Sequence, residues 1–292
     1  MRIEEILSYL RCPDDSGLLH RCEGGLCCSE CGRVFPEIGS GVFDLLPLKP
    51  NPRALECLCS AHQEVYLLEF QRSIRLDDES LPWGAPEATP DKWANRKRQQ
   101  VEWLLPLLLA GKTAEDLVLC DVSAGSGYYT LRCAAEFKYV LHCDLSAQSI
   151  SYARRRADQA GLKNMLFCRV DYFSLPIKSV DRVICMDTLI RGQQHEEMLM
   201  KASLGALSPS GVAVVDFHNW WHNPIRRMGL LPDNFHNNRS YSKREAHSIV
   251  DGSGVGQCEY FRYDESSGTP ASLTQFLRWM LPASRHTFRV AP

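Results

Sequence analysis

The chain has 292 residues, of which 45% are hydrophobic and 23% are charged, close to the average for globular proteins. This composition excludes a disordered chain, and the formal net charge of −2 gives no overall positive field that would attract nucleic acid or a membrane. No apolar run approaches the roughly 18 residues that a membrane-spanning helix needs. The acidic residues Glu4 and Glu5 are unlike the start of a signal peptide, so we expect a cytoplasmic protein.

Five of the thirteen cysteines lie between Cys12 and Cys31. An odd number of cysteines without a leader segment predicts reduced thiols, and a local cluster of reduced thiols indicates a metal site. Cys28 and Cys31 form a Cys-x-x-Cys turn before a glycine, an arrangement typical of zinc sites.

The second half of that metal site departs from the usual pattern. A second Cys-x-x-Cys turn would need a cysteine at position 15, where the chain has Asp15. Because a carboxylate can also bind zinc, the predicted ligand set is Cys12, Asp15, Cys28 and Cys31, with Cys22 and Cys27 as alternative ligands. The alternative interpretation is a small β unit that has lost its metal.

Composition divides the chain into residues 1–47, a proline-rich linker and helical lid at 48–92, and a larger domain at 93–292. In the larger domain, short apolar runs alternate with helical patterns, which predicts an α/β fold with a parallel sheet covered on both faces. The predicted strands are 117–120, 139–143, 166–170, 180–186, 212–217, 257–263 and 286–290, and the predicted helices are 129–137, 146–160, 195–207, 242–250 and 272–280.

A glycine loop follows the first predicted strand and leads into a helix. Gly125 and Gly127 allow a ligand to approach the backbone closely, and the helix that follows presents free N–H groups. Asp144 ends the second strand, where a carboxylate can bind two ribose hydroxyls. Four successive strands end in an aspartate, and the carboxyl ends of parallel strands form the ligand-binding edge of such a sheet. These aspartates are Asp121, Asp144, Asp171 and Asp187.

These motifs resemble the class I S-adenosylmethionine-dependent methyltransferases, especially the ubiquinone/menaquinone C-methyltransferase-like branch, over about residues 95–220. The matching segments are Asp-Val-Ser-Ala-Gly-Ser-Gly at 121–127, Asp-Leu-Ser at 144–146, Asp-Tyr-Phe-Ser-Leu-Pro at 171–176, Asp-Arg-Val-Ile at 181–184 and Leu-Ser-Pro-Ser-Gly at 207–211. The resemblance implies a Rossmann-like, doubly wound sheet of seven strands with S-adenosylmethionine as cofactor. A nicotinamide-dependent dehydrogenase is the alternative, but the Leu-Pro turn at 175–176 and the late Pro-Ser-Gly turn fit it less well.

The resemblance also implies the roles of individual residues. The loop with Asp121, Ser123, Gly125 and Gly127 would contact the methionine part of the cofactor. Asp144 and Leu145 would contact the ribose, Asp171 and Tyr172 would flank the adenine, and Asp187 would begin the loop beside the sulfonium. The chain departs from the family at Ser123, where the first glycine is usual, and at Arg191, where many small-molecule methyltransferases have a histidine.

The segment at 31–47 resembles the zinc-ribbon-like domains related to the tRNA-methyltransferase activator subunit. This resemblance implies a structural zinc ion in front of the methyltransferase domain. Residues 1–47 carry four arginines and eight acidic residues, and this negative balance argues against a unit that grips RNA.

The predicted acceptor pocket is an insertion at about 217–241. It contains two adjacent tryptophans and three histidines, and residues 217–244 carry a net charge of +4. A histidine can act as a general base near neutral pH, so His218 is the first catalytic candidate, with His222 and Arg191 after it. Aromatic and arginine side chains favour a planar, anionic small molecule. The alternative is a surface lid in which these residues only pack.

Two other functions remain open from the sequence. The chain could be an rRNA or tRNA base methyltransferase, although it lacks an Asn-Pro-Pro-Tyr motif and a Pro-Cys motif. It could also be a non-catalytic module that keeps the methyltransferase fold. We expect a small-molecule acceptor as partner, with no nucleic acid and no membrane, and the sequence leaves a homodimer open.

Overall fold

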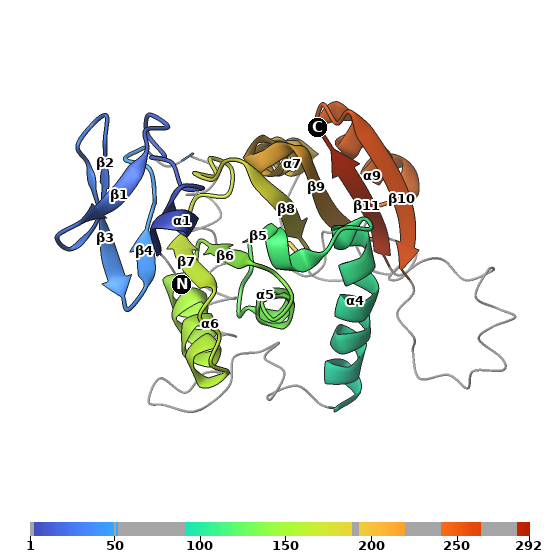
Figure 1. Ribbon diagram of the computed structural model, residues 1–292. Coiled ribbons are helices and arrows are strands. Elements are labelled where there is room, and N and C mark those ends of the chain that lie inside the picture. Colours follow the sequence, from blue (N-terminus) through green and yellow to red (C-terminus); the bar gives the residue numbers. More distant parts are fainter. Residues whose placement is uncertain (1–2, 50, 52–90, 189–192, 220–240, 264–284) are drawn as a thin grey trace, which may run out of the picture.

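The computed structural model describes residues 3–49, 51, 91–188, 193–219, 241–263 and 285–292. Within these residues, eleven strands join into one sheet in the order β1-β2-β3-β4-β7-β6-β5-β8-β9-β11-β10 (Figure 1). The N-terminal strands form one end of the sheet, and the C-terminal strands form the other end.

The centre of the sheet consists of five parallel strands, and almost every residue of the first four is buried. They are β5 (Val118–Val122), β6 (Tyr139–Asp144), β7 (Met165–Arg169), β8 (Val180–Cys185) and β9 (Leu207–His218). Continuous burial is expected of parallel strands covered on both faces. Strand β11 (Arg285–Ala291) pairs antiparallel with β9 and with β10 (Gln257–Tyr263).

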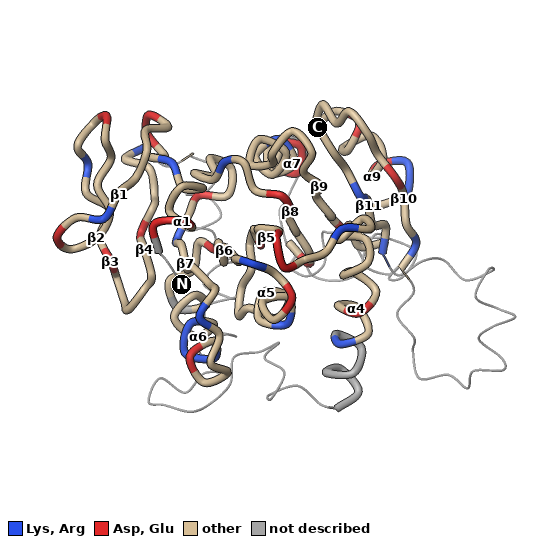
Figure 2. The backbone as a smooth tube through the Cα atoms, viewed as in Figure 1, with Lys and Arg blue, Asp and Glu red and all other residues tan. Residues whose placement is uncertain are grey.

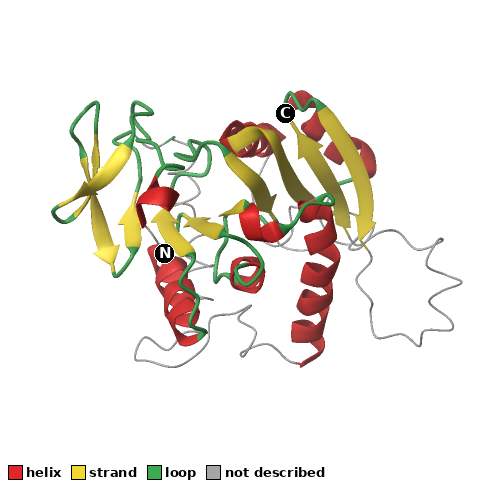
Figure 3. Ribbon diagram, viewed as in Figure 1, coloured by secondary structure: helices red, strands yellow, loops and turns green. Residues whose placement is uncertain are grey.

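Helices cover both faces of the central sheet (Figure 3). Helices α4 (Asp91–Leu109), α5 (Tyr128–Cys133) and α6 (Ala147–Gln159) contribute side chains to one hydrophobic core. Helices α7 (Gln193–Ala206) and α9 (Lys243–Gly252) contribute to the other. Ser146 caps α6 by accepting a hydrogen bond from the Ser149 N–H. The doubly wound α/β architecture is therefore confirmed.

The N-terminal unit is part of the sheet rather than a separate layer. It contains α1 (Ile3–Leu7), β1 (Leu19–Cys22), β2 (Gly25–Cys28), β3 (Val34–Gly39) and β4 (Val42–Asp44). Strand β4 pairs in parallel with β7, and Val42 lies opposite Phe167. A seven-stranded sheet preceded by a separate β unit was predicted, and the structure differs because the β4–β7 pairing adds β1–β4 to the seven strands β5–β11. Strand β4 thereby covers an edge of β7 that would otherwise be exposed.

The prediction that the cysteines are all reduced is wrong at one place. Cys22 and Cys27 form a disulfide across the β1–β2 hairpin, with their Cα atoms 5.8 Å apart. The count of cysteines could not show this, because the pairing depends on the hairpin, which brings these two residues together. The disulfide also removes both residues from the set of alternative metal ligands.

Several predicted features lie outside the described residues, namely most of the lid at 48–92, the helix at 272–280 and residues 220–240 of the acceptor insertion. Among the helices that the structure describes, none has both the length and the apolar character needed to cross a membrane. Acidic and basic residues are interspersed along the described backbone (Figure 2).

Candidate functional site

The glycine loop connects β5 to α5 through left-handed backbone conformations. Ser123 has φ +63°, Gly125 has φ +55° and Gly127 has φ +81°. A Cβ atom on Gly127 would lie 3.0 Å from the Cβ of Ala153 and 3.1 Å from the Cγ of Leu131. Glycine is therefore required at 127 by both its backbone conformation and the packing of α5 against α6. Ser123 adopts the left-handed conformation that the usual glycine would adopt, so the loop keeps its turn despite this departure from the family.

Asp144 lies directly against this loop, at the end of β6. One carboxylate oxygen accepts a hydrogen bond from the Gly125 N–H at 2.8 Å, and the other accepts one from the Ser146 N–H at 2.8 Å. The side chain is buried, which raises the pKa of its carboxyl group. The structure thus brings together the predicted ribose-binding residue and the predicted methionine-binding loop. Leu145 follows Asp144 and is also buried.

Asp121 lies beneath the loop rather than on its surface. Its carboxylate accepts a hydrogen bond from the Thr130 hydroxyl of α5, and only 1% of the residue is exposed. Burial raises the pKa of Asp121 to about 8. Nδ1 of His142 lies 3.1 Å from the same hydroxyl, and burial lowers the pKa of His142 to about 3. This buried group supports the turn between β5 and α5.

Asp171 and Tyr172 follow β7, beside the end of β6, where the adenine is expected. Both residues are buried. The two carboxylate oxygens of Asp171 accept hydrogen bonds from the N–H groups of Phe173 at 2.9 Å and Asn51 at 3.1 Å. The second contact comes from the segment that follows the N-terminal unit, which the sequence did not indicate.

Asp187 and His218 meet at the ends of β8 and β9. Nε2 of His218 lies 3.2 Å from a carboxylate oxygen of Asp187, and the hydroxyl of Tyr129 donates to the other oxygen at 2.9 Å. The Asp187 N–H donates to the carboxylate of Asp216 at 2.8 Å. The sequence analysis assigned Asp187 to the loop beside the sulfonium and His218 to proton transfer, and the structure brings the two side chains into contact.

Arg285 is a member of this cluster that sequence reasoning missed, as it missed Tyr129 and Asp216. Its guanidinium group forms ion pairs with Asp187 and Asp216, and its side chain is only 4% exposed. The residue begins β11, and its partner across the sheet is His218. The only signal in the sequence was a charged residue at the start of a buried strand, and strand pairing was needed to show its partners.

A cavity is lined by His218 and by other residues at the ends of β8 and β9. Its lining includes Leu199 and Met200 of α7, together with Phe217 and Tyr241. The hydroxyl of Tyr241 donates to Glu196 of α7, which is buried. The other two catalytic candidates, Arg191 and His222, lie outside the described residues.

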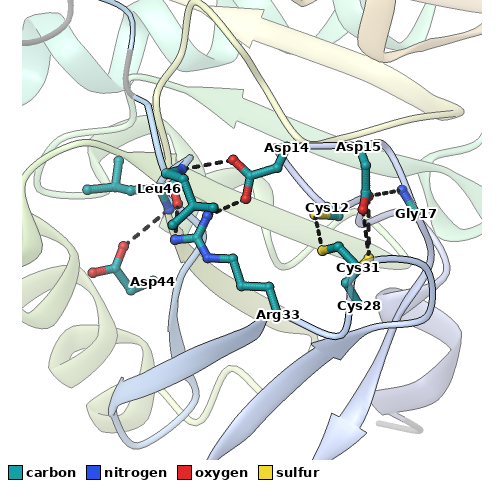
Figure 4. A network of polar contacts seen from close by, with 10 residues as sticks. Cys12, Asp14, Asp15, Gly17, Cys28, Cys31, Arg33, Asp44 and Leu46 are labelled. Atoms are coloured by element: carbon teal, nitrogen blue, oxygen red, sulfur yellow. Dashed lines mark hydrogen bonds and ion pairs between the residues drawn. The ribbon is translucent and has the colours of Figure 1, made fainter.

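The four predicted metal ligands lie together in the N-terminal unit. One ligand atom from each of Cys12, Asp15, Cys28 and Cys31 lies within 4.8 Å of the others. Sγ of Cys28 lies 3.3 Å from a carboxylate oxygen of Asp15, and the Sγ atoms of Cys12 and Cys31 are 3.8 Å apart. Figure 4 shows the three thiols and the carboxylate turned toward one another. Three sulfur ligands and one oxygen ligand fit the tetrahedral preference of zinc.

Comparisons with known proteins agree with this geometry. A family model described as "Methyltransferase domain" matches residues 114–266, which is more than half of the chain. The chain belongs to the methyltransferase-domain family. Its glycine loop, Asp144 and Asp187–His218 pair all lie within the matched segment.

Individual relatives of this methyltransferase are distant. The chloroplastic magnesium protoporphyrin IX methyltransferase of Arabidopsis thaliana is 26% identical over 150 residues, which cover 50% of this chain and 48% of the relative. The chain thus spans about half the length of the curated relative that it matches.

Two solved structures show the same fold. The magnesium protoporphyrin IX methyltransferase of Synechocystis PCC 6803 with bound S-adenosylhomocysteine has a TM-score of 0.55 and 15% identity, over 82% of this chain and 100% of that one. The N-methyltransferase NodS of Bradyrhizobium japonicum WM9 has a TM-score of 0.54 and 15% identity, over 77% and 96% of the two chains.

Proposed function

We propose that this methyltransferase transfers a methyl group to a small-molecule acceptor bound beside His218. The observation that carries the proposal is the Asp187–His218 pair, which lies at the same edge of the sheet as the glycine loop and Asp144. In a doubly wound sheet this edge is the one that binds ligands. The cofactor residues and the candidate base are thus on one edge.

The chain's own residues would perform three tasks in this reaction. Bound S-adenosylmethionine supplies an electrophilic methyl group on its sulfonium. Asp144 would hold the ribose hydroxyls while the backbone of the glycine loop lies against the methionine part, which fixes the position of the methyl group. His218 would accept the proton of an acceptor hydroxyl or amine at Nδ1 or orient that group, and Asp187, which lies against Nε2, would fix the position of the imidazole ring.

The chemistry of the acceptor is a further part of the proposal. Two adjacent tryptophans at 220–221 and several arginines at 226–244 suit a planar, anionic molecule. The name of the Arabidopsis relative, which gives magnesium protoporphyrin IX as its substrate, is in keeping with such a molecule.

Calorimetry with S-adenosylhomocysteine tests the cofactor assignment. The parent chain should bind this ligand, and Asp144→Ala should weaken binding at least about tenfold because charge-assisted hydrogen bonds to the ribose are lost. Asp158→Ala is a matched control, because Asp158 pairs with Arg154 on the surface of α6. Equal affinity in the parent and Asp144→Ala would contradict the assignment.

We also propose that the N-terminal cluster holds one structural zinc ion, with Asp15 as its fourth ligand. Cys12 and Cys28 are buried, and the cluster draws on two separate turns that a metal ion would join. Metal analysis should find about one zinc ion per chain, and Cys28→Ser should abolish it. Cys258→Ser is the control because Cys258 is exposed on β10. Protein that takes up no zinc when it is supplied would contradict the site.

A further inference from the structure

An ion pair next to the metal cluster joins the turn that carries Cys12 and Asp15 to the turn that carries Cys28 and Cys31. Arg33 follows the Cys28–Cys31 turn, and its guanidinium group pairs with Asp14, the neighbour of Asp15. Arg33 also donates to the backbone oxygen of Leu46 at 2.9 Å, and Asp14 accepts a hydrogen bond from the Leu48 N–H at 2.8 Å. The Arg33–Asp14 pair therefore holds the segment at 46–48, which leads out of the N-terminal unit (Figure 4).

The same segment reaches the adenine side of the cofactor site. Three residues after Leu48, the Asn51 N–H donates to the carboxylate of Asp171 at 3.1 Å. Asp171 is fully buried at the end of β7. Asp14 and Arg33 lie next to the metal cluster, and they contact the backbone only a few residues before Asn51, which binds Asp171.

A second contact connects the end of β4 with both strands that carry the cofactor residues. Arg169 of β7 pairs with Asp44 of β4 at 3.1 Å and donates to the backbone oxygen of Leu145 at 3.1 Å. Asp44 in turn accepts a hydrogen bond from the Leu46 N–H at 3.2 Å. Asp44 is therefore linked through Arg169 to Leu145, the neighbour of Asp144, and Asn51 contacts Asp171 itself.

The Arg33–Asp14 ion pair is too weak to fix the segment at 46–48 by itself. Both side chains remain partly exposed, at 23% and 20%. Ion pairs of this kind contribute little to stability, because solvent screens them and two long side chains must be ordered. Structural zinc sites in small domains contribute far more. The pair is therefore held in place when a metal ion fixes the two turns that carry Asp14 and Arg33.

We propose that metal occupancy of the N-terminal cluster sets the affinity for the cofactor, and that Asp14 and Arg33 are the positioning residues that transmit it to Asp171. This inference rests on the proposed cofactor site and on the proposed zinc site. Loss of the metal would release the two turns and, with them, residues 46–49 and the hydrogen bond from Asn51. Asp171 would then no longer be held in one arrangement. Neither Asp14 nor Arg33 would contact the cofactor.

Calorimetry with S-adenosylhomocysteine on the full chain tests this inference, with metal content measured in every sample. The zinc-loaded parent should bind about tenfold more tightly than the same protein after treatment with a chelator, which is within the usual range of coupling between sites. Zinc-loaded Asp14→Asn and Arg33→Gln should bind as weakly as the chelated parent while they retain one zinc ion. Removing zinc from Asp14→Asn should then change its affinity little.

A control separates this route from general damage to the N-terminal unit. Glu37→Gln removes an ion pair with Arg21 in the same unit, at 2.8 Å. The other contacts of this pair are with the Gly41 N–H and the Phe43 ring, and not with the described residues 44–49 or 51. This variant should keep both the parent affinity and its dependence on zinc.

The outcomes distinguish failure of this inference from failure of the proposed function. Equal affinity with and without zinc, parent-like affinity in loaded Asp14→Asn, or absence of zinc binding would overturn the inference and leave the cofactor site intact. A zinc-loaded parent that binds no S-adenosylhomocysteine would overturn both.

Discussion

The imidazole of His218 lies 3.2 Å from the carboxylate of Asp187, so the ends of β8 and β9 are joined at the ligand-binding edge. The carboxylate of Asp187 also pairs with Arg285 and accepts a hydrogen bond from the hydroxyl of Tyr129. A histidine held by a fixed carboxylate is an arrangement suited to proton transfer, because the carboxylate orients the ring. The side chain of His218 is 40% exposed, whereas that of Arg285 is 4% exposed, so the proposed function assigns contact with the acceptor to His218.

We expect His218→Ala to reduce turnover of the true acceptor by about 10²-fold or more, the range of a lost general base. The affinity for S-adenosylhomocysteine should change little, because Asp144 and the glycine loop are untouched. Steady-state kinetics with calorimetry on the same samples measures both quantities. His20→Ala, an exposed histidine of β1, is the control. Normal turnover in His218→Ala would place the base elsewhere or show that the acceptor atom needs none.

Arg285 offers a prediction about stability. Removing a partner from a buried ion pair leaves uncompensated charge, which costs about 3–5 kcal/mol. Arg285→Ala should therefore lower the free energy of unfolding by about that amount, because Asp216 is buried with it. Arg289→Ala on the same strand removes an ion pair with the exposed Glu259 and should cost less than about 1 kcal/mol. Urea unfolding of both variants is the measurement, and equal losses would refute the prediction.

Gly127 and Gly111 share φ +81° and differ in their surroundings. A Cβ atom at 127 would meet Ala153 at 3.0 Å, whereas nothing lies within 4 Å of one at 111. Both alanine substitutions carry the cost of left-handed backbone, about 1–2 kcal/mol. Gly127→Ala should additionally displace the glycine loop and weaken S-adenosylhomocysteine binding at least about tenfold. Gly111→Ala should bind normally in the same calorimetric experiment, and parent-like binding by Gly127→Ala would contradict the packing argument.

Local sequence patterns were sufficient for the central sheet. The strands around Asp121, Asp144 and Asp171 are short, apolar and buried, and each is followed by a turn, so periodicity located them within a few residues. The glycine loop and the cap at Ser146 are also local signals. These features determine where the cofactor residues lie, because the ends of parallel strands meet at one edge.

Contacts between distant segments could not be predicted in the same way. The pairing of β4 with β7, the ion pairs of Arg285 and the hydrogen bond from Asn51 to Asp171 each join residues far apart in the chain. No local period encodes such pairings. The Cys22–Cys27 disulfide was missed for a related reason, since the argument from cysteine number ignored the hairpin that positions both residues.

The buried carboxyl group of Asp121 predicts a specific dependence of stability on pH. Its pKa is about 8 in the folded chain, where burial is the main cause, and about 3.9 in an unfolded chain. Between these values the folded state holds a proton that the unfolded state has released, so this group makes the free energy of unfolding fall as pH rises from about 4 to 8. The largest contribution to the slope is about 1.4 kcal/mol per pH unit for one proton.

Asp121→Asn cannot ionise and keeps an oxygen that can accept a hydrogen bond from the Thr130 hydroxyl. Urea unfolding between pH 5 and 7 should therefore show a smaller decline in this variant than in the parent, whereas the exposed Asp158→Asn should keep the parent slope. Identical slopes in the parent and Asp121→Asn would show that Asp121 is already ionised in the folded chain.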